Sequence, residues 1–348
     1  PYMDNGIKFF GGDGFKLPDE LEARIESLIA NPSLVGGSAQ GPDIGRATRV
    51  DDAVGRYCVA LKSLFPRDLS LDGIRIAVDC AHGAAYRVAP LVFEELGAEV
   101  IPLNADPDGT NINEHCGALH PGAMARKVLE MRCDLGLALD GDGDRAILCD
   151  ERGEIVDGDG VLAICASEMH KAGTLQGGGL VGTVMTNFGL ELMLRDLGLT
   201  LHRADVGDRY VLEEMRRRGC NVGGEPSGHL LFLDSSTTGD GILSCLKTLE
   251  LMLRAQKHLS ELAGRFTRLP QVVLSKKVRE KPPIEALERV SLAIRSVEDA
   301  LQGRGRVNVR YSGTSPLIRI MVEGEDDGRV RALAESIMAA AVEDGVVP

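Results

Sequence analysis

The stretch Asp140-Gly141-Asp142-Gly143-Asp144-Arg145 decides how this 348-residue chain is interpreted. It places three carboxylates at alternate positions, with glycines that let a backbone curl. The apolar runs on either side, 135–139 and 146–149, are typical of short buried strands, so the acidic residues occupy a tight loop between two strands. Carboxylates this close repel one another unless a cation neutralises them, and their hard oxygen atoms suit Mg²⁺. The sequence therefore predicts a magnesium site at Asp140, Asp142 and Asp144.

Two other interpretations fit this loop less well. A solvated acidic turn rarely needs three spaced aspartates and no other polar residue. A calcium loop of the EF-hand type would also use the three aspartates, with Glu151 as its last ligand. However, Arg145 stands where that loop needs glycine, and strands rather than helices flank it. Arg145 instead supplies a fixed positive fork beside the metal, which suits a phosphate.

Composition and charge restrict the partners of the chain. Of all residues 44% are hydrophobic and 26% are charged, and the net charge is −13. A protein this acidic is a poor general ligand for nucleic acid or for an anionic membrane. No apolar stretch is long enough to span a bilayer. The eight cysteines are scattered without a C-x-x-C pair, which indicates reduced thiols and a cytoplasmic protein.

Strands alternate with helices along most of the chain. This pattern predicts an α/β fold of consecutive related domains with mixed or parallel sheets, and ligands bind such sheets at the carboxyl ends of their strands. We expect a strand over 7–10, a helix from Pro18 whose apolar face ends at Ile29, and one long helix over 241–263. The predicted parts are a first segment 1–50, α/β domains 51–154 and 155–265, and a smaller α+β domain 266–348.

A second group of residues, near the C-terminus, suits a phosphate. Two arginines flank a loop that carries hydroxyls and a glycine, and backbone N–H groups in such a loop can surround an anion. The alternative is an ordinary hairpin with outward-facing arginines. The candidate phosphate ligands are Arg310, Ser312, Gly313, Thr314 and Arg319.

Other candidate residues lie in three further segments. In the loop 223–229, Glu225 and Ser227 can bind sugar hydroxyls and His229 can move a proton, although a capped turn explains them equally well. Lys8 is a general-base candidate only if its surroundings lower its pKa. Asp208-Arg209 either orients a ligand or caps the helix that follows.

Taken together, these loops resemble the α-D-phosphohexomutase superfamily over the whole chain. Within it, the segments 5–10, 206–210 and 224–229, and 237–241 after them, are most similar to the bacterial phosphoglucosamine mutases. Pro226 departs from the residue expected in the sugar loop, which leaves mannose and glucose phosphates open as substrates. The resemblance implies four domains around a central cleft. It also implies an active-site phosphoserine in a Ser-His-Asn-Pro motif of which Pro1 is the last residue.

The resemblance further implies the reaction. Phosphate is exchanged between O6 and O1 of glucosamine phosphate through a hexosamine 1,6-bisphosphate, with Mg²⁺ as cofactor, and the product feeds cell-wall precursor synthesis. The 348 residues do not include the implied serine, so we expect the chain alone to be inactive. A homodimer is compatible with the resemblance. The rival interpretations are a phosphomannomutase/phosphoglucomutase, a non-catalytic sugar-phosphate binding protein and, with fewer matching ligands, a two-metal phosphatase.

Overall fold

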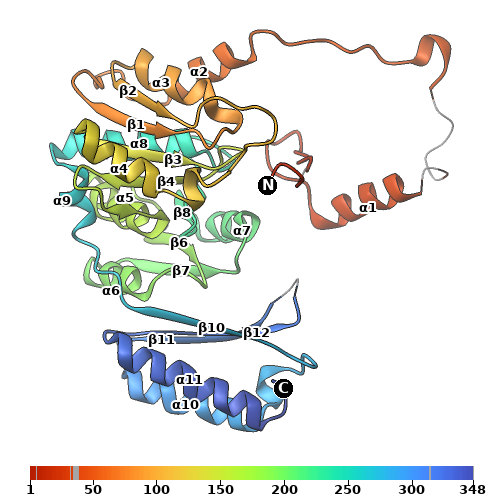
Figure 1. Ribbon diagram of the computed structural model, residues 1–348, viewed down its shortest axis with the longest axis vertical. Coiled ribbons are helices and arrows are strands. Elements are labelled where there is room, and N and C mark those ends of the chain that lie inside the picture. Colours follow the sequence, from red (N-terminus) through yellow and green to blue (C-terminus); the bar gives the residue numbers. More distant parts are fainter. Residues whose placement is uncertain (5, 32, 34–38, 313–314, 348) are drawn as a thin grey trace.

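The computed structural model describes residues 1–4, 6–31, 33, 39–312 and 315–347. It has three sheets, stacked along the long axis of the molecule in Figure 1. The α/β class predicted from the sequence is confirmed. The boundaries proposed for the four domains stay a prediction. Among the described residues, no helix is both long and apolar enough to cross a membrane.

The first sheet has five strands in the order β2-β1-β3-β4-β5. Strands β1, β2 and β3 are parallel, whereas β4 and β5 are antiparallel additions, so the sheet is mixed. Its elements are α2 (Ala53–Ser63), β1 (Arg75–Asp79), α3 (Val88–Glu95), β2 (Glu99–Leu103), α4 (Gly122–Met131), β3 (Leu135–Leu139), β4 (Ala146–Asp150) and β5 (Ile155–Val156).

The second sheet repeats this plan with four strands in the order β7-β6-β8-β9. Helices α5 and α8 pack against each other between the two sheets, and a single apolar core joins both units. The elements are α5 (Gly158–Ala172), β6 (Gly179–Thr183), α6 (Phe188–Asp196), β7 (Thr200–Ala204), α7 (Asp208–Arg218), β8 (Val222–Gly224), β9 (Leu230–Phe232), α8 (Gly241–Ala255) and α9 (Leu259–Ala263).

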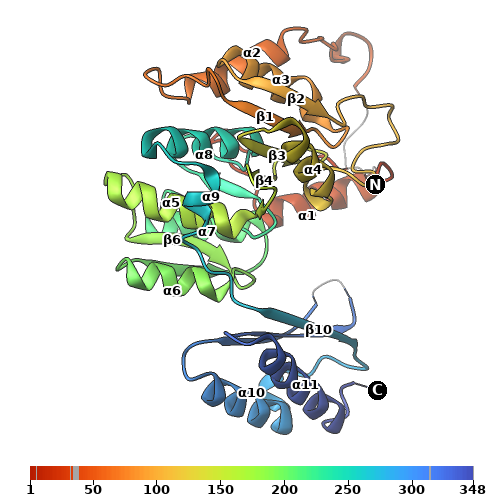
Figure 2. The same ribbon diagram turned by 60° about the vertical axis from the view of Figure 1, so that its left-hand side comes forward.

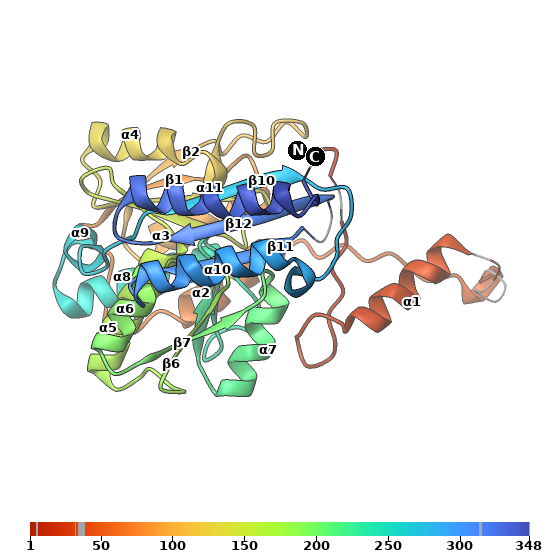
Figure 3. The same ribbon diagram turned by 90° about the horizontal axis from the view of Figure 1, so that it is seen from below.

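The last sheet is antiparallel, with the order β10-β12-β11. Helices α10 and α11 cover the face turned away from the other sheets, as Figures 1 and 3 show. They enclose a separate apolar core with that face. The elements are β10 (Gln271–Lys277), α10 (Glu288–Leu301), β11 (Arg306–Tyr311), β12 (Leu317–Glu323) and α11 (Asp327–Glu343), and short 3₁₀ turns lie at Gly41–Asp43, Ala84–Tyr86, Gly117–Leu119 and Ile284–Ala286.

The N-terminal segment differs from its prediction. The strand expected over 7–10 is wrong, because among the residues that the structure describes this segment pairs only through one isolated bridge, between Phe10 and Lys16. Helix α1 (Asp19–Ala30) forms as predicted, but none of its residues is buried, and Ile29 keeps 70% of its surface exposed. In Figures 1 and 3 the helix lies beside the main body rather than within it, whereas in the view of Figure 2 the main body lies in front of it.

The long helix expected over 241–263 is also wrong, because it is two helices. Helix α8 ends at Ala255, and Gln256 has a left-handed φ of 52° that no α-helix continues through. The next helix, α9, begins at Leu259. The sequence shows no glycine or proline at this break, and glutamine is a good helix former, so the periodicity alone runs through it.

Candidate active site

The acidic loop is the hairpin between β3 and β4, at the carboxyl end of β3. Asp140 is buried, and its Oδ1 accepts hydrogen bonds from the backbone N–H groups of Gly143 (3.1 Å) and Arg145 (3.2 Å). Gly143 takes a φ of 77°, which favours glycine. The curl brings one carboxylate oxygen each from Asp140, Asp142 and Asp144 within 4.8 Å of one another. The sequence-predicted metal residues therefore form one cluster.

A neighbouring loop holds this hairpin from the side. The backbone N–H of Ala84 donates to the carbonyl of Gly141 at 2.8 Å. A Cβ on Gly83 would lie 2.3 Å from that same carbonyl oxygen, and a Cβ on Gly141 would lie 2.6 Å from the side-chain nitrogen of Asn113. Gly83 is therefore needed for a close backbone approach and Gly141 leaves room for the Asn113 side chain, and both contacts fix the position of the metal loop.

Burial and charge separate the acidities of these carboxylates. Burial, together with the negative charges of Asp144 and Asp142, raises the pKa of Asp140 to about 6. Burial opposes ionisation of Asp144 too, but its contacts with His229 and Lys8 outweigh burial and hold its pKa well below the ordinary value. Asp144 is thus stabilised as an anion by neighbouring groups, whereas Asp140 is left with a raised pKa despite its contacts with Arg145.

Lys8 lies directly on the metal cluster. Its Nζ is 2.7 Å from Oδ2 of Asp142 and 3.0 Å from Oδ2 of Asp144. Burial by itself would lower the pKa of Lys8, but the hydrogen bonds to these two carboxylates raise it above the usual value. A lysine acts as a base near neutral pH only when its pKa falls, so this arrangement suits a fixed cation.

The donor set fits a divalent cation. Oδ1 of Asp144 is buried, and within the described part of the chain it accepts no close hydrogen bond, with Nδ1 of His229 at 3.5 Å and Nε of Arg145 at 3.8 Å. A buried carboxylate oxygen without a close partner is costly, and a metal ion at the cluster would satisfy it. Three oxygen ligands on a hairpin leave coordination positions for water and a phosphorylated ligand, as Mg²⁺ prefers.

Backbone pairing joins the metal loop to the loop 223–229. Arg145 and His229 form an isolated antiparallel bridge, and the N–H of Ala146 donates to the carbonyl of Gly228 at 3.0 Å. The Arg145 side chain turns back towards the cluster, with Nε 3.2 Å from Oδ2 of Asp140. The two loops therefore belong to one site, although they come from different sheets.

His229 lies between the metal cluster and the start of α7. Its ring is buried, with Nδ1 3.5 Å from Oδ1 of Asp144 and Nε2 3.7 Å from Oδ2 of Asp208. Nε2 has no hydrogen-bond partner in the described part of the chain. A Cβ on Gly239 would lie 2.2 Å from Nε2, so this glycine packs closely on the ring. The imidazole is therefore held in place, with its two nitrogens directed towards Asp144 and Asp208.

Glu225 and Ser227 face each other in the same loop. The Ser227 hydroxyl donates to Oε2 of Glu225 at 3.1 Å, and the backbone N–H of Gly207 donates to Oε1 at 2.7 Å. Glu225 is therefore tied to the turn that precedes α7. A carboxylate and a hydroxyl held side by side can accept from and donate to vicinal sugar hydroxyls.

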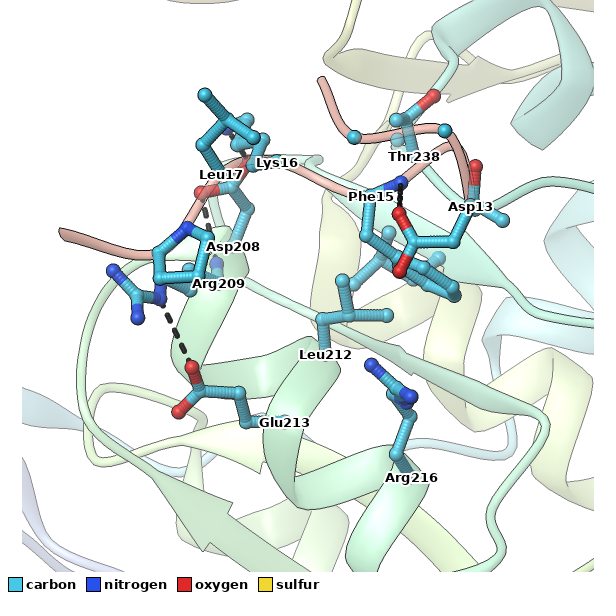
Figure 4. A pocket seen from close by; sticks show the side chains of 16 residues that line it. Asp13, Phe15, Lys16, Leu17, Asp208, Arg209, Leu212, Glu213, Arg216 and Thr238 are labelled. Atoms are coloured by element: carbon cyan, nitrogen blue, oxygen red, sulfur yellow. Dashed lines mark hydrogen bonds and ion pairs between the residues drawn. The ribbon is translucent and has the colours of Figure 1, made fainter. Parts of the chain in front are cut away.

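Asp208 and Arg209 begin α7 but point to different partners. Asp208 pairs with Lys16, which, against the opposing effect of burial, lowers the pKa of the carboxyl. Arg209 pairs with Asp19 and, at 2.9 Å, with Glu213. Figure 4 shows the contacts of Asp208 with Lys16 and of Arg209 with Glu213 at a cavity of about 410 Å³ between the segment 11–18 and α7. Lys16 was not predicted from the sequence, because no motif announces a contact 192 residues away.

A larger cavity, of about 810 Å³, borders the metal loop on its other side. Its walls include Lys8, Asp142, His82 and Asn113. His82 has a left-handed φ of 48°, and its Nδ1 is buried without a partner among the described residues. Neither His82 nor Asn113 was predicted from the sequence. The signal for them is that they follow β1 and β2, whose carboxyl ends are where parallel strands place ligand-binding loops.

The candidate phosphate residues lie in the C-terminal unit, apart from this cluster. Arg310 and Arg319 are opposite each other on β11 and β12. Neither side chain makes a hydrogen bond or an ion pair with another described residue. The backbone of Ser312 is held by Leu317 at 2.8 Å and by Lys281 at 2.6 Å. Gly313 and Thr314 lie outside the described residues.

Comparisons with known proteins match this arrangement. Residues 56–153, 157–269 and 274–340 match the phosphoglucomutase/phosphomannomutase α/β/α domain II, α/β/α domain III and C-terminal domain. The chain belongs to this family of phosphohexomutases. Phosphoglucosamine mutases are among its most similar relatives. That of Geobacter sp. (strain M21) is 53% identical over 337 residues, which is 97% of this chain and 74% of the relative. That of Anaeromyxobacter sp. (strain Fw109-5) is 54% identical over 341 residues, 97% of this chain and 73% of the relative.

Solved structures share the fold at lower identity. A phosphoglucomutase/phosphomannomutase family protein from Burkholderia thailandensis aligns with a TM-score of 0.73 and 20% identity, over 94% of this chain and 70% of that chain. The N-acetylphosphoglucosamine mutase of Aspergillus fumigatus, in complex with GlcNAc-6P and magnesium, aligns with a TM-score of 0.67 and 20% identity, over 84% of this chain and 65% of that chain. At this identity the likeness concerns the fold alone.

Proposed function

We propose that this chain carries the metal-, sugar- and phosphate-binding parts of a phosphoglucosamine mutase, which interconverts glucosamine 6-phosphate and glucosamine 1-phosphate. One observation carries the proposal: the three aspartates converge within 4.8 Å on a loop that is paired with the sugar loop. Relatives at 52–54% identity with this name support the amino sugar as substrate. The expected partner is thus a small sugar phosphate.

Each residue group has a distinct part in this proposal. Asp140, Asp142 and Asp144 would hold Mg²⁺, which neutralises charge on a phosphoryl group when bound. Lys8 and Arg145 keep fixed positive charge beside that group. Glu225 and Ser227 hold sugar hydroxyls, and His229 takes and returns the hydroxyl proton at Nε2. The residues proposed for the non-transferring phosphate are Arg310, Ser312, Gly313, Thr314 and Arg319.

The phosphoryl donor in this proposal is a phosphoserine, and the sugar passes through a hexosamine 1,6-bisphosphate that also primes the enzyme. Donor phosphate bonds to the free sugar hydroxyl as the serine oxygen leaves, and the other phosphate returns to serine in the second half-reaction. Substrate must therefore bind in two orientations. A paired carboxylate and hydroxyl suit this, because they bind vicinal hydroxyls from either direction.

The test combines binding with turnover. Calorimetry on the chain with glucosamine, mannose and glucose 6-phosphates, with and without Mg²⁺, should show the tightest binding for the amino sugar with Mg²⁺. The chain is then extended by the upstream segment of a relative, and ³¹P NMR follows each sugar phosphate with Mg²⁺ and a trace of 1,6-bisphosphate. A new anomeric phosphate signal, mainly from the amino sugar, is the expected result.

Other outcomes identify other functions. Faster conversion of mannose or glucose phosphate would keep the mechanism and replace the substrate. Tight binding that is indifferent to Mg²⁺, with no conversion of any sugar, would indicate a binding protein instead. Light scattering on the same samples tests whether the chain forms the homodimer with which the family resemblance is compatible.

A further inference from the structure

The sheet of the C-terminal unit has two unlike faces. Val307, Val309, Ile318 and Ile320 point into the apolar core under α10 and α11. Alternate residues of a strand point to opposite faces, so Arg306 and Arg310 share the other face with Arg319 and Glu323. Figure 1 shows that this second face is turned towards the β6–β7 sheet. It therefore carries both the contact with the neighbouring unit and the two candidate phosphate arginines.

At one end of this face, Arg306 and Glu323 form a buried ion pair. They are opposite each other in the register of β11 and β12. The Arg306 Nε and Nη2 atoms lie 2.9 and 2.7 Å from Oε2 of Glu323, and the Glu323 side chain has no exposed surface. The other oxygen, Oε1, accepts from the Gln271 amide at 2.8 Å and from the backbone N–H of Phe188 at 3.2 Å. Every polar atom of the Glu323 carboxylate is thus engaged.

Arg306 also donates hydrogen bonds to the loop 183–188, which follows β6. Nη2 of Arg306 donates to the carbonyl of Val184 at 2.8 Å and to that of Thr186 at 3.3 Å. Nη1 of Arg203 on β7 donates to the carbonyls of Thr183 (3.0 Å) and Thr186 (2.7 Å). The carbonyls of the loop 183–188 are therefore bound by two guanidinium groups, one from each unit, which meet at Thr186.

The other end of the same strands carries the phosphate residues. Arg310 and Arg319 are opposite each other, four residues along β11 and β12 from the ion pair. At the rise of a β-strand this is about 13 Å. We call the contact of Arg306 and Glu323 with the loop 183–188 the joint. A rotation of about 10° at the joint would move the two arginines by roughly 2 Å. A misplacement of about 1 Å can cost a factor of a hundred in an oriented site. The position of these arginines thus depends on the angle at the joint.

We propose that Arg306 and Glu323 are positioning residues, which set the angle of the C-terminal sheet so that Arg310 and Arg319 reach the phosphate of the bound sugar. The role rests on the proposed function, since it supposes a phosphorylated ligand in the cleft. A buried ion pair adds little net stability compared with apolar side chains, but it favours a single relative orientation of the groups that it joins. A contact that positions residues at a distance requires such a single orientation.

The test uses Glu323→Gln and Arg306→Lys in the full chain. Gln keeps the size and one acceptor of Glu323, and Lys keeps the charge but not the fork of Arg306. Spin labels are attached at Asp196→Cys, the exposed end of α6, and at Leu292→Cys, the 58%-exposed position on α10. The eight native cysteines are all buried, so labelling is selective. Both variants should broaden the distribution of distances between the two labels and weaken glucosamine 6-phosphate binding at least about tenfold. The affinity for Mn²⁺, the paramagnetic ion used here in place of Mg²⁺ at the aspartate cluster, should not change.

The matched controls are Glu325→Gln and Arg304→Lys. These residues form a similar pair at 3.7 Å in the same unit, but both are more than half exposed. They should leave the distances and the affinity unchanged. If a joint variant does not fold, Gln271→Met is tested in its place, because this substitution removes only one hydrogen-bond donor to Glu323.

The outcomes separate the joint from the function. Wild-type distances and affinity in both joint variants would overturn the proposal. A wild-type chain that binds no sugar phosphate would refute the proposed function, whereas the label distances would still report on the joint. Loss of Mn²⁺ affinity in the joint variants would show general damage rather than positioning, and would also overturn it.

Discussion

The three aspartates of the metal loop differ in exposure and in the contacts that their carboxylates make. Asp140 is buried and accepts two backbone N–H groups, whereas the Asp142 side chain is 56% exposed and contacts Lys8. We predict that Asp142→Asn lowers the affinity for Mn²⁺ at least about tenfold with an unchanged circular dichroism spectrum, since one of three anionic ligands is lost. An electron paramagnetic resonance titration measures it. Full affinity in this variant would refute the metal assignment.

Metal affinity should also depend on pH through Asp140. Burial and then the charges of Asp144 and Asp142 raise its pKa to about 6, so below pH 6 a proton competes with the metal for this carboxylate. We predict that Mg²⁺ affinity, measured by calorimetry, is flat above pH 7 and falls as the pH is lowered from 6 to 5. In Asp142→Asn one repelling charge is gone, so the midpoint of the remaining pH dependence should move to lower pH. A midpoint that does not move would contradict this electrostatic account.

Gly83 tests how strictly the loop position matters. A Cβ at this residue would meet the backbone carbonyl of Gly141 at 2.3 Å, and a backbone atom cannot rotate away as a side chain can. We predict that Gly83→Ala displaces the metal loop and weakens Mn²⁺ binding severalfold, although no ligand is changed. Gly55→Ala in α2 is the control, because a Cβ there meets nothing within 4 Å. Equal affinities in the two variants would show that the loop can yield.

At the scale of single elements, helix α1 is the least supported. It has the apolar face that its sequence predicts, yet none of its residues is buried. We predict that Ile29→Ala changes the free energy of unfolding by less than about 0.5 kcal/mol, whereas Leu190→Ala in the fully buried start of α6 costs about 2–5 kcal/mol. Urea denaturation measures both. A large cost for Ile29→Ala would mean that the face of α1 is covered in solution.

Elements were predictable where the information is local. The acidic hairpin between β3 and β4 and the helix α1 follow from short periodic runs and turn residues, and the structure has them where they were expected. The strand at 7–10 fails because a strand needs an edge to pair with, which no local pattern shows. The prediction of one helix over 241–263 fails at Gln256, because local hydrogen bonds close α8 there and a capping box between His258 and Glu261 starts α9, and no glycine or proline marks the break.

In the candidate site, too, local features could be predicted from the sequence, whereas contacts between distant segments could not. The types of residue in each loop indicated their chemistry, and the structure brings the metal and sugar loops together. The pairing of Lys16 with Asp208 and of Arg209 with Asp19 depends on how distant segments fold back. Likewise, nothing in the sequence around Lys8 shows that two carboxylates surround its ammonium group and raise its pKa. The roles of the site residues stay predictions that the experiments above test.

For the whole molecule, the arrangement of the cores predicts how it unfolds. One apolar core joins the first and second sheets, whereas the C-terminal sheet has its own core and meets the others through the polar joint at Arg306 and Glu323. Chains with separate cores often depart from two-state behaviour. We therefore predict two transitions in scanning calorimetry, one for the first two units, which share a core, and one for the C-terminal unit.

Mg²⁺ should distinguish these transitions, because its proposed ligands belong to the larger core. A ligand that binds only the folded state stabilises it by RT ln(1 + [L]/Kd), about 2.7 kcal/mol at a hundredfold excess over Kd. We predict that Mg²⁺ raises the midpoint of one transition and leaves that of the C-terminal unit in place. Asp142→Asn should abolish the shift. A single transition that moves as a whole would mean that the joint couples the two cores into one cooperative unit, and that the C-terminal sheet cannot turn independently of the metal site.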